Sequence, residues 1–208
     1  EAHIITLQKA RTWKAPAHLK PAFNDGMSVA VTVKGGTALT SNELEANANA
    51  IYLAIGKVIE ELTERDTPLD DMICIMTPRR FSELLNHPKL MNKDFTDSSG
   101  GFASRRIVEV QGLQVMQSTA FPKKAITNHI LSTTTNGNAF NVTAEDIKGE
   151  IIVFSKSMSL VTVTAKPFTS RFYDDETNMT NVLDCYSMYT VATRRPDTIG
   201  VVLVTETA

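Results

Sequence analysis

The chain has 208 residues, of which 42% are hydrophobic and 21% are charged, and its formal net charge is −2. These values are typical of one globular domain or two small lobes, and they exclude a disordered or fibrous chain. The slight negative charge also disfavours a protein that binds nucleic acid by neutralising many phosphates, because such proteins carry clustered Lys and Arg.

The first 40 residues are expected to form short extended pieces and turns, because prolines and glycines interrupt them. Alternating apolar residues predict one strand here, at 28–34. A long helix is predicted next, from Asn42 to Arg65. Thr40 and Glu43 have the spacing of a capping box, and apolar residues then recur at steps of three and four. We expect this helix to pack on a sheet, which is favoured over a coiled coil because the repeat is short and is flanked by Asn and Gly.

Short elements are predicted in the middle of the chain. The apolar run at 72–76 has the length of a buried strand, and Thr77 with a following proline predicts a short helix through Leu85. The sequence RIVEV-QG-LQVM predicts a β-hairpin that turns at Gln111 and Gly112. The polar segment 123–149 is expected to be a surface connection, with NHIL and AFNV as candidate edge strands.

The last third of the chain is predicted to be mostly strand. Alternation from Ser159 towards Tyr173 and again through 183–191 indicates two long strands that form a paired arm, which is marginal alone and needs a partner. Between them lies an acidic tip of three adjacent carboxylates. A final buried strand is predicted at 199–204. Helices dispersed among mainly antiparallel strands indicate the α+β class.

Sites for chemistry are not evident in the sequence. The four histidines are scattered, and no nucleotide-binding glycine motif or nucleophile elbow occurs. The carboxylate pairs lie at predicted turns, where solvent would keep them ionised. Cys74 and Cys185 are both expected to be buried packing residues. We therefore predict no catalytic residue, no metal and no cofactor, and the absence of an apolar run of 18 residues predicts no membrane span.

Three arginine pairs occur, at 79–80, 105–106 and 194–195. They could contact phosphates or form ion pairs. Ion pairing is favoured, because no aromatic residues are interleaved with them to stack on bases.

The ordered motifs TPRRFSELL (77–85), RRIVEVQGLQVMQSTAFP (105–122) and RPDTIGVVL (195–203), together with the long helix before them, resemble the major capsid proteins of tailed, double-stranded DNA bacteriophages. These proteins have the Hong Kong 97 fold. The similarity is greatest to the podoviruses, the short-tailed phages of the T-seven group. It extends from about Asp25 to Val204 and is weakest at 123–149.

The resemblance implies a structural subunit of an icosahedral head, with the triangulation number T=7 expected for the family, and no enzymatic activity. Residues 27–149 would form the axial domain, which 196–208 would close. Residues 150–195 would form the β-arm of the peripheral domain, and 1–26 the end of an upstream peripheral segment. The family's N-terminal arm, extended loop and spine helix have no counterpart in this chain.

The implied partners are copies of the chain in pentamers and hexamers, together with scaffolding and portal proteins. Packaged DNA would be touched loosely and no membrane is involved. The protein would assemble in the bacterial cytoplasm and reside in the virion. Three carboxylates on one turn repel each other unless they are compensated, so we expect the tip to meet a basic group of a neighbouring subunit. The predicted subunit contacts are Asp174, Asp175, Glu176, Arg171, Arg194 and Arg195.

Two alternatives remain open at this point. One is an encapsulin-type shell of a bacterial compartment, which has a related fold. The other is a soluble α+β enzyme with an unrecognised site. Binding of a cargo peptide to shells would favour the first, and a stable monomer at all concentrations would favour the second.

Overall fold

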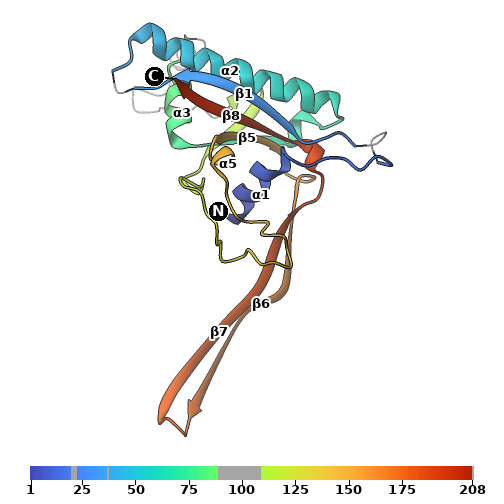
Figure 1. Cartoon of the computed structure of the whole chain (residues 1–208), viewed down its shortest axis with the longest axis vertical. Coiled ribbons are helices and arrows are strands. Elements are labelled where there is room, and N and C mark those ends of the chain that lie inside the picture. The colour runs from blue at the N-terminus through green and yellow to red at the C-terminus, as the bar shows by residue number, and fades with distance from the viewer. Residues whose placement is uncertain (20–22, 37, 89–108, 208) are drawn as a thin grey trace, which may run out of the picture.

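The computed structural model describes residues 1–19, 23–36, 38–88 and 109–207. A compact lobe contains the helices and a central sheet, and a long β-ribbon projects from one end of it (Figure 1). The elements are α1 (Ala2–Ala10), β1 (Met27–Lys34), α2 (Ser41–Glu64), β2 (Met72–Met76), α3 (Pro78–Leu84), β3 (Glu109–Val110), β4 (Leu113–Gln117), α5 (Ala144–Ile147), β5 (Gly149–Ser155), β6 (Leu160–Asp175), β7 (Thr180–Thr193) and β8 (Ile199–Thr207).

The central sheet has six strands in the order β1-β8-β5-β2-β4-β3. The pairs β1/β8 and β2/β4 are parallel, while β5/β8, β2/β5 and β3/β4 are antiparallel. Strands β6 and β7 pair only with each other among the described strands, as an antiparallel ribbon. The α+β class is confirmed.

Helix α2 covers one face of the sheet. Thr40 and Glu43 form the predicted capping box, and the apolar stripe of the helix, including Ile51, Ile55 and Val58, is completely buried. The helix approaches β8 closely at Gly200, where an added Cβ would lie 2.4 Å from Val58 Cγ1. Glycine is therefore required at this crossing, because a side chain would displace the helix.

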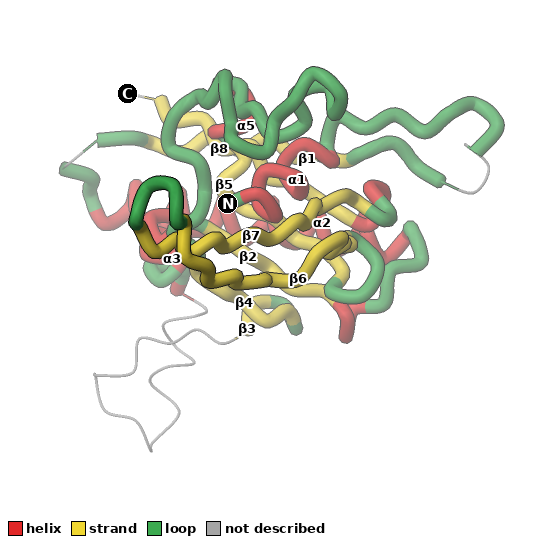
Figure 2. The backbone as a smooth tube through the Cα atoms, turned by 90° about the horizontal axis from the view of Figure 1, so that it is seen from below, coloured by secondary structure: helices red, strands yellow, loops and turns green. Residues whose placement is uncertain are grey.

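Helix α1 lies against the opposite face, where Ile4 and Leu7 pack with Ile152, Ile199 and Val201. The view from below shows α1 beside the ribbon (Figure 2). This helix corrects our expectation that the first 40 residues would contain only extended pieces and turns. Burial of Ile4 and Leu7 against the sheet stabilises this helix.

The segment 123–149 also differs from expectation. The candidate edge strand NHIL forms bends and turns. In AFNV the first two residues are turn, and Val142 pairs with Ile126 in an isolated antiparallel bridge. Asparagine and threonine side chains hydrogen-bond to nearby backbone, for example Asn136 Oδ1 accepts from Thr133 N at 2.9 Å. Such local bonds replace a strand ladder.

The other predicted elements are confirmed with small shifts at their ends. The hairpin turns at Gln111 and Gly112, which both have positive φ. Residues 106–108 of its first strand lie outside the described residues. Within the described residues, no helix is long and apolar enough to cross a membrane.

Candidate functional site

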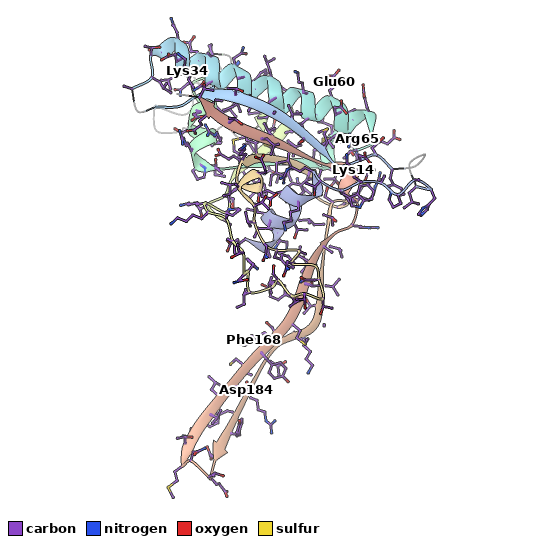
Figure 3. The ribbon with its side chains drawn as sticks, viewed as in Figure 1. Lys14, Lys34, Glu60, Arg65, Phe168 and Asp184 are labelled. Carbon is purple, nitrogen blue, oxygen red and sulfur yellow. The ribbon has the colours of Figure 1, made fainter. Side chains whose placement is uncertain are left out.

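The β6–β7 arm is the most exposed part of the fold. Its 16-residue and 14-residue strands span roughly 50 Å at the usual rise of a β-strand. In the part of the chain that the structure describes, no helix or further sheet packs on the ribbon beyond its base. Phe168 and Asp184 mark its middle and outer parts (Figure 3). Two register shifts bend β6 between Thr164 and Thr169.

Large apolar side chains are exposed along the whole arm, and two of them, Phe172 and Leu183, are two-thirds accessible. Soluble monomers rarely leave such a contiguous surface open to water, so a surface of this kind indicates binding to another molecule. The exposed apolar residues of the arm are Val161, Val163, Phe168, Phe172, Tyr173, Met179, Leu183, Tyr186, Met188 and Tyr189.

The predicted contact residues fall into two separate groups. Asp174 and Asp175 are the last residues of β6, and Glu176 begins the turn at the tip. Arg171 is also near the tip, with its guanidinium carbon 5.3 Å from the centre of the Tyr173 ring. These four candidates lie together at the outer end of the arm.

The other two candidates, Arg194 and Arg195, lie at the base of the arm. Arg194 is exposed, whereas Arg195 binds Asp197, with 2.9 Å between Nη2 and Oδ2. The guanidinium of Arg195 also lies 5.6 Å from the centre of the Phe23 ring. Arg195 therefore braces the junction between the arm and the lobe.

The arginine pair at 79–80 confirms the ion-pair interpretation. Arg80 is completely buried and binds Glu83, Glu150 and Glu206, which come from α3, β5 and β8. Arg79 also binds Glu206, at 2.8 Å. Burial would raise the pKa of Glu206, but hydrogen bonds and charge from the arginines hold that pKa below its ordinary value. This cluster joins three elements of the lobe.

The second arginine pair, at 105–106, lies outside the described residues, so its contacts are not described.

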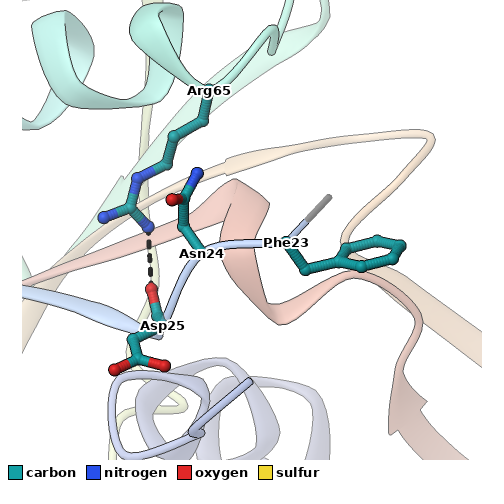
Figure 4. Close-up of a pocket in the computed structure, with 4 residues that line it drawn as sticks. All are labelled: Phe23, Asn24, Asp25 and Arg65. Carbon is teal, nitrogen blue, oxygen red and sulfur yellow. Dashed lines mark hydrogen bonds between the residues drawn. The ribbon is translucent and has the colours of Figure 1, made fainter. Parts of the chain in front are cut away.

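A shallow polar pocket lies between α2 and the segment before β1 (Figure 4). Phe23, Asn24, Asp25 and Arg65 line it, and Arg65 Nη1 donates to the Asp25 carbonyl at 2.9 Å. This arrangement contains no nucleophile paired with a base. In the described ranges, no three metal-binding side chains gather in one place.

The cysteines differ from each other. Cys74 is buried in β2, and burial raises the pKa of its thiol to about 12. Cys185 in β7 is a free thiol and is exposed. Our expectation that both are buried is wrong for Cys185, because period-two alternation places a residue on one face of a ribbon without showing whether that face is covered.

Comparison with solved structures identifies the fold. The chain superposes on a chain of the mature capsid of bacteriophage PhiM1 with a TM-score of 0.84 and 37% sequence identity, covering 98% of this chain and 59% of that chain. The chain has the fold of bacteriophage capsid proteins. The predicted resemblance to phage major capsid proteins is therefore confirmed.

More distant capsid structures share the fold. The chain matches the capsid of cyanophage P-SCSP1u with a TM-score of 0.74 at 17% identity, covering 98% of this chain and 60% of that one. A chain from Mycobacterium phage Che8 gives a TM-score of 0.54 at 13% identity, covering 96% and 55%. The chain thus spans about three fifths of the length of these two phage capsid chains, from PhiM1 and P-SCSP1u. No protein-family model matches the sequence, and no curated protein matches it either.

Sequence reasoning found the capsid fold and an arm that needs a partner, but it missed α1 and the exposure of Cys185. A signal for α1 was present, since Ile4, Leu7 and Ala10 have helical spacing. No signal in a single sequence marks an alternating strand as uncovered.

Proposed function

We propose that the chain is a structural subunit that self-assembles into the icosahedral head of a tailed bacteriophage and encloses double-stranded DNA. The observation that carries this proposal is the match to the PhiM1 capsid chain at 37% identity over nearly the whole chain. The exposed arm supports it, because intersubunit contacts would cover apolar surface that the lobe leaves open. Phage capsid structures favour this function over a bacterial compartment shell or an enzyme.

Within this function we propose an axial lobe and a peripheral arm. The axial lobe would comprise 27–149 and 196–208, with the arm at 150–195 and 1–26 as the end of a peripheral segment. The pairing of β5 with β2 and β8 favours counting β5 with the lobe and beginning the arm at β6. The lobe would meet its copies around the symmetry axes in pentamers and hexamers.

Further partners follow from the same proposal. Scaffolding and portal proteins would act during assembly in the host cytoplasm, and the finished subunit would reside in the virion. Packaged DNA would lie near the inner surface without specific contacts, as the net charge of −2 suggests. A short-tailed phage and a T=7 shell remain the expectations that the sequence resemblance gave.

The acidic tip is proposed as one intersubunit contact. Asp174 and Glu176 are exposed, and with Asp175 they would pair with a basic group of a neighbouring copy, while Arg171 and Arg194 would meet acidic groups. Arg195 would act indirectly, by holding the base of the arm.

The test is electron microscopy of the purified full-length gene product. We expect closed shells from the unchanged protein, and a much lower shell yield when the three tip carboxylates are replaced by serine. Persistent monomers from the unchanged protein would contradict the proposed function. An unchanged shell yield from the serine variant would contradict only the role of the tip.

A further inference from the structure

The arm is joined to the lobe by two short crossings, residues 156–159 between β5 and β6 and residues 194–198 between β7 and β8 (Figure 1). Three hydroxyl side chains at these crossings, Ser155, Ser159 and Thr198, have no exposed surface. Burying a hydroxyl costs free energy unless it is hydrogen-bonded. The partners of these three side chains therefore show what the crossings hold in place.

A chain of hydrogen bonds runs through the three hydroxyls and links the two crossings. The backbone amide of Ser155 donates to Ser159 Oγ at 2.9 Å, and Ser159 Oγ lies 2.9 Å from Thr198 Oγ1. Thr198 Oγ1 donates in turn to the Arg195 carbonyl at 2.8 Å. Because the hydroxyl proton of Thr198 is used in that bond, Ser159 donates to Thr198. The bonds therefore all run in one direction, and bonds in such a chain strengthen each other.

The backbone of Ser159 makes the same connection. Its carbonyl accepts from Arg194 N at 2.9 Å, so Ser159 binds the second crossing through both its backbone and its side chain. Arg195, the next residue, is held by its ion pair with Asp197, whose side chain is 1% exposed. Both strands of the arm are therefore fixed to each other at the point where they leave the lobe.

Asp71, which immediately precedes β2, anchors the first crossing to the lobe. Its carboxylate accepts from Ser155 Oγ, from Ser157 Oγ at 2.7 Å and from Ser157 N at 3.2 Å. Its carbonyl accepts from Lys156 N at 2.9 Å. Hydrogen bonds from Ser155 and then from Ser157 hold the pKa of Asp71 below its usual value, so the carboxylate stays charged at neutral pH. The neighbouring Asp70, in contrast, is exposed.

We propose that these bonds form a polar pivot, made by Asp71, Ser155, Ser157, Ser159 and Thr198, which fixes the direction of the arm relative to the lobe in the free subunit. Apolar contacts at the base of the arm resist separation but are not directional. Hydrogen bonds impose both distances and angles. Without the polar pivot, the two crossings would act as a hinge, and the arm would sample a wide range of directions.

A preset arm also assists assembly, and this consequence rests on the proposed function. An arm that already points in one direction loses less conformational freedom when it binds a neighbouring copy. The polar pivot itself is a property of the single chain, so it is tested without any shell.

The experiment measures the distance between two spin labels in full-length, unassembled subunits. One label is attached to Cys185, which is exposed in the arm, and the other to Lys57→Cys, which replaces an exposed residue of α2. Cys74 is buried and the pKa of its thiol is raised to about 12, so it stays unlabelled. We expect one narrow distribution of distances between the lobe and the arm.

Two variants remove bonds of the polar pivot, and each has a matched control. Thr198→Val and Asp71→Ala should each widen the distribution at least about twofold. Thr198→Ser keeps the hydroxyl, and Asp70→Ala removes the adjacent exposed carboxylate, so both should leave the width within about a fifth of that of the unchanged protein. Since valine keeps the shape of threonine and serine loses a methyl group, a purely steric role of Thr198 would reverse the order of its two variants.

A broad distribution in the unchanged protein would overturn the polar pivot, and so would equal widths in Thr198→Val and Thr198→Ser. Widening only by Thr162→Val, which removes the hydroxyl 3.0 Å from His3 Nε2, would assign the direction of the arm to α1 instead. If urea denaturation shows that Thr198→Val unfolds the lobe, the comparison of Asp71→Ala with Asp70→Ala decides.

The role in assembly has a separate readout. We expect Thr198→Val to form shells at least about threefold more slowly than Thr198→Ser. Equal rates beside widened distances would overturn the role in assembly and leave the polar pivot standing. Failure of the unchanged protein to form shells would overturn the proposed function, whereas the distances in free subunits would still decide the polar pivot.

Discussion

The strands of the lobe and those of the arm differ in how far they are covered. In the lobe, α2 and α1 cover the two faces of the sheet, and residues such as Ile152 and Val202 have no exposed surface. In the arm, the equivalent apolar positions, such as Phe172 and Leu183, remain mostly open. Because burial of apolar surface is the main stabilising contribution, the lobe is stabilised by its own core, whereas the arm leaves apolar surface that another segment or molecule can cover.

The largest effect on the lobe is expected from Arg80→Ala. This change leaves Glu83, Glu150 and Glu206 close together without their buried cation. We expect a loss of about 3 kcal/mol in the free energy of unfolding, near the lower end for a broken buried pair because the carboxylates are partly solvated. Urea denaturation of unassembled subunits measures it.

The control for Arg80→Ala is Arg79→Ala. The Arg79 side chain is 57% exposed and reaches Glu83 and Glu206 from the surface. We expect this change to cost less than about 1 kcal/mol. Equal losses from the two variants would show that the buried cluster does not hold the lobe together.

Gly200→Ala is expected to have the next largest effect. The new Cβ would lie 2.4 Å from Val58 Cγ1 and 2.6 Å from Met27 Cε, so α2 or β1 must shift. Overpacking of this kind costs about 2 kcal/mol, measured by the same denaturation. In the arm, Ser187→Val also adds one non-hydrogen atom, but at an exposed site, and should change stability by less than about 0.5 kcal/mol. A neutral Gly200→Ala would mean that the sheet and α2 are loosely packed.

The smallest expected effect concerns pH. Hydrogen bonds from Lys34, and then from Thr40, lower the pKa of Glu43 from 4.5 to about 2. A carboxyl whose pKa is lower in the folded state adds stability that is present above pH 4.5 and is lost as the pH falls towards 2. Glu43→Gln should therefore make the stability of the lobe less steeply dependent on pH in this window. Superimposable pH curves for the two proteins would rule out this contribution.

Much of the lobe could be predicted from the sequence because its signals are local. The capping box at Thr40 and Glu43 and the apolar run at 72–76 each specify an element within a few residues. The sequence signal for helix α1 was weaker, because it consisted only of the spacing of Ile4, Leu7 and Ala10, and the position of the helix depends on distant partners such as Ile199.

The candidate site was harder to predict than the fold. The acidic tip and the paired strands follow from composition and alternation, but the exposure of Cys185 depends on the missing cover, and a sequence does not show that. The partition of the arm into two faces depends on the register shifts between Thr164 and Thr169, which no local pattern specifies.

Hydrogen exchange of backbone amides, measured in free subunits and in assembled shells, tests the central claim most directly. We expect β5 and β8 to be strongly protected in both states, because the lobe is folded without a partner. We expect the outer amides of β6 and β7 to exchange readily in free subunits and at least tenfold more slowly in shells. An arm that is as protected in free subunits as in shells would contradict the account, because it would then need no neighbouring copy.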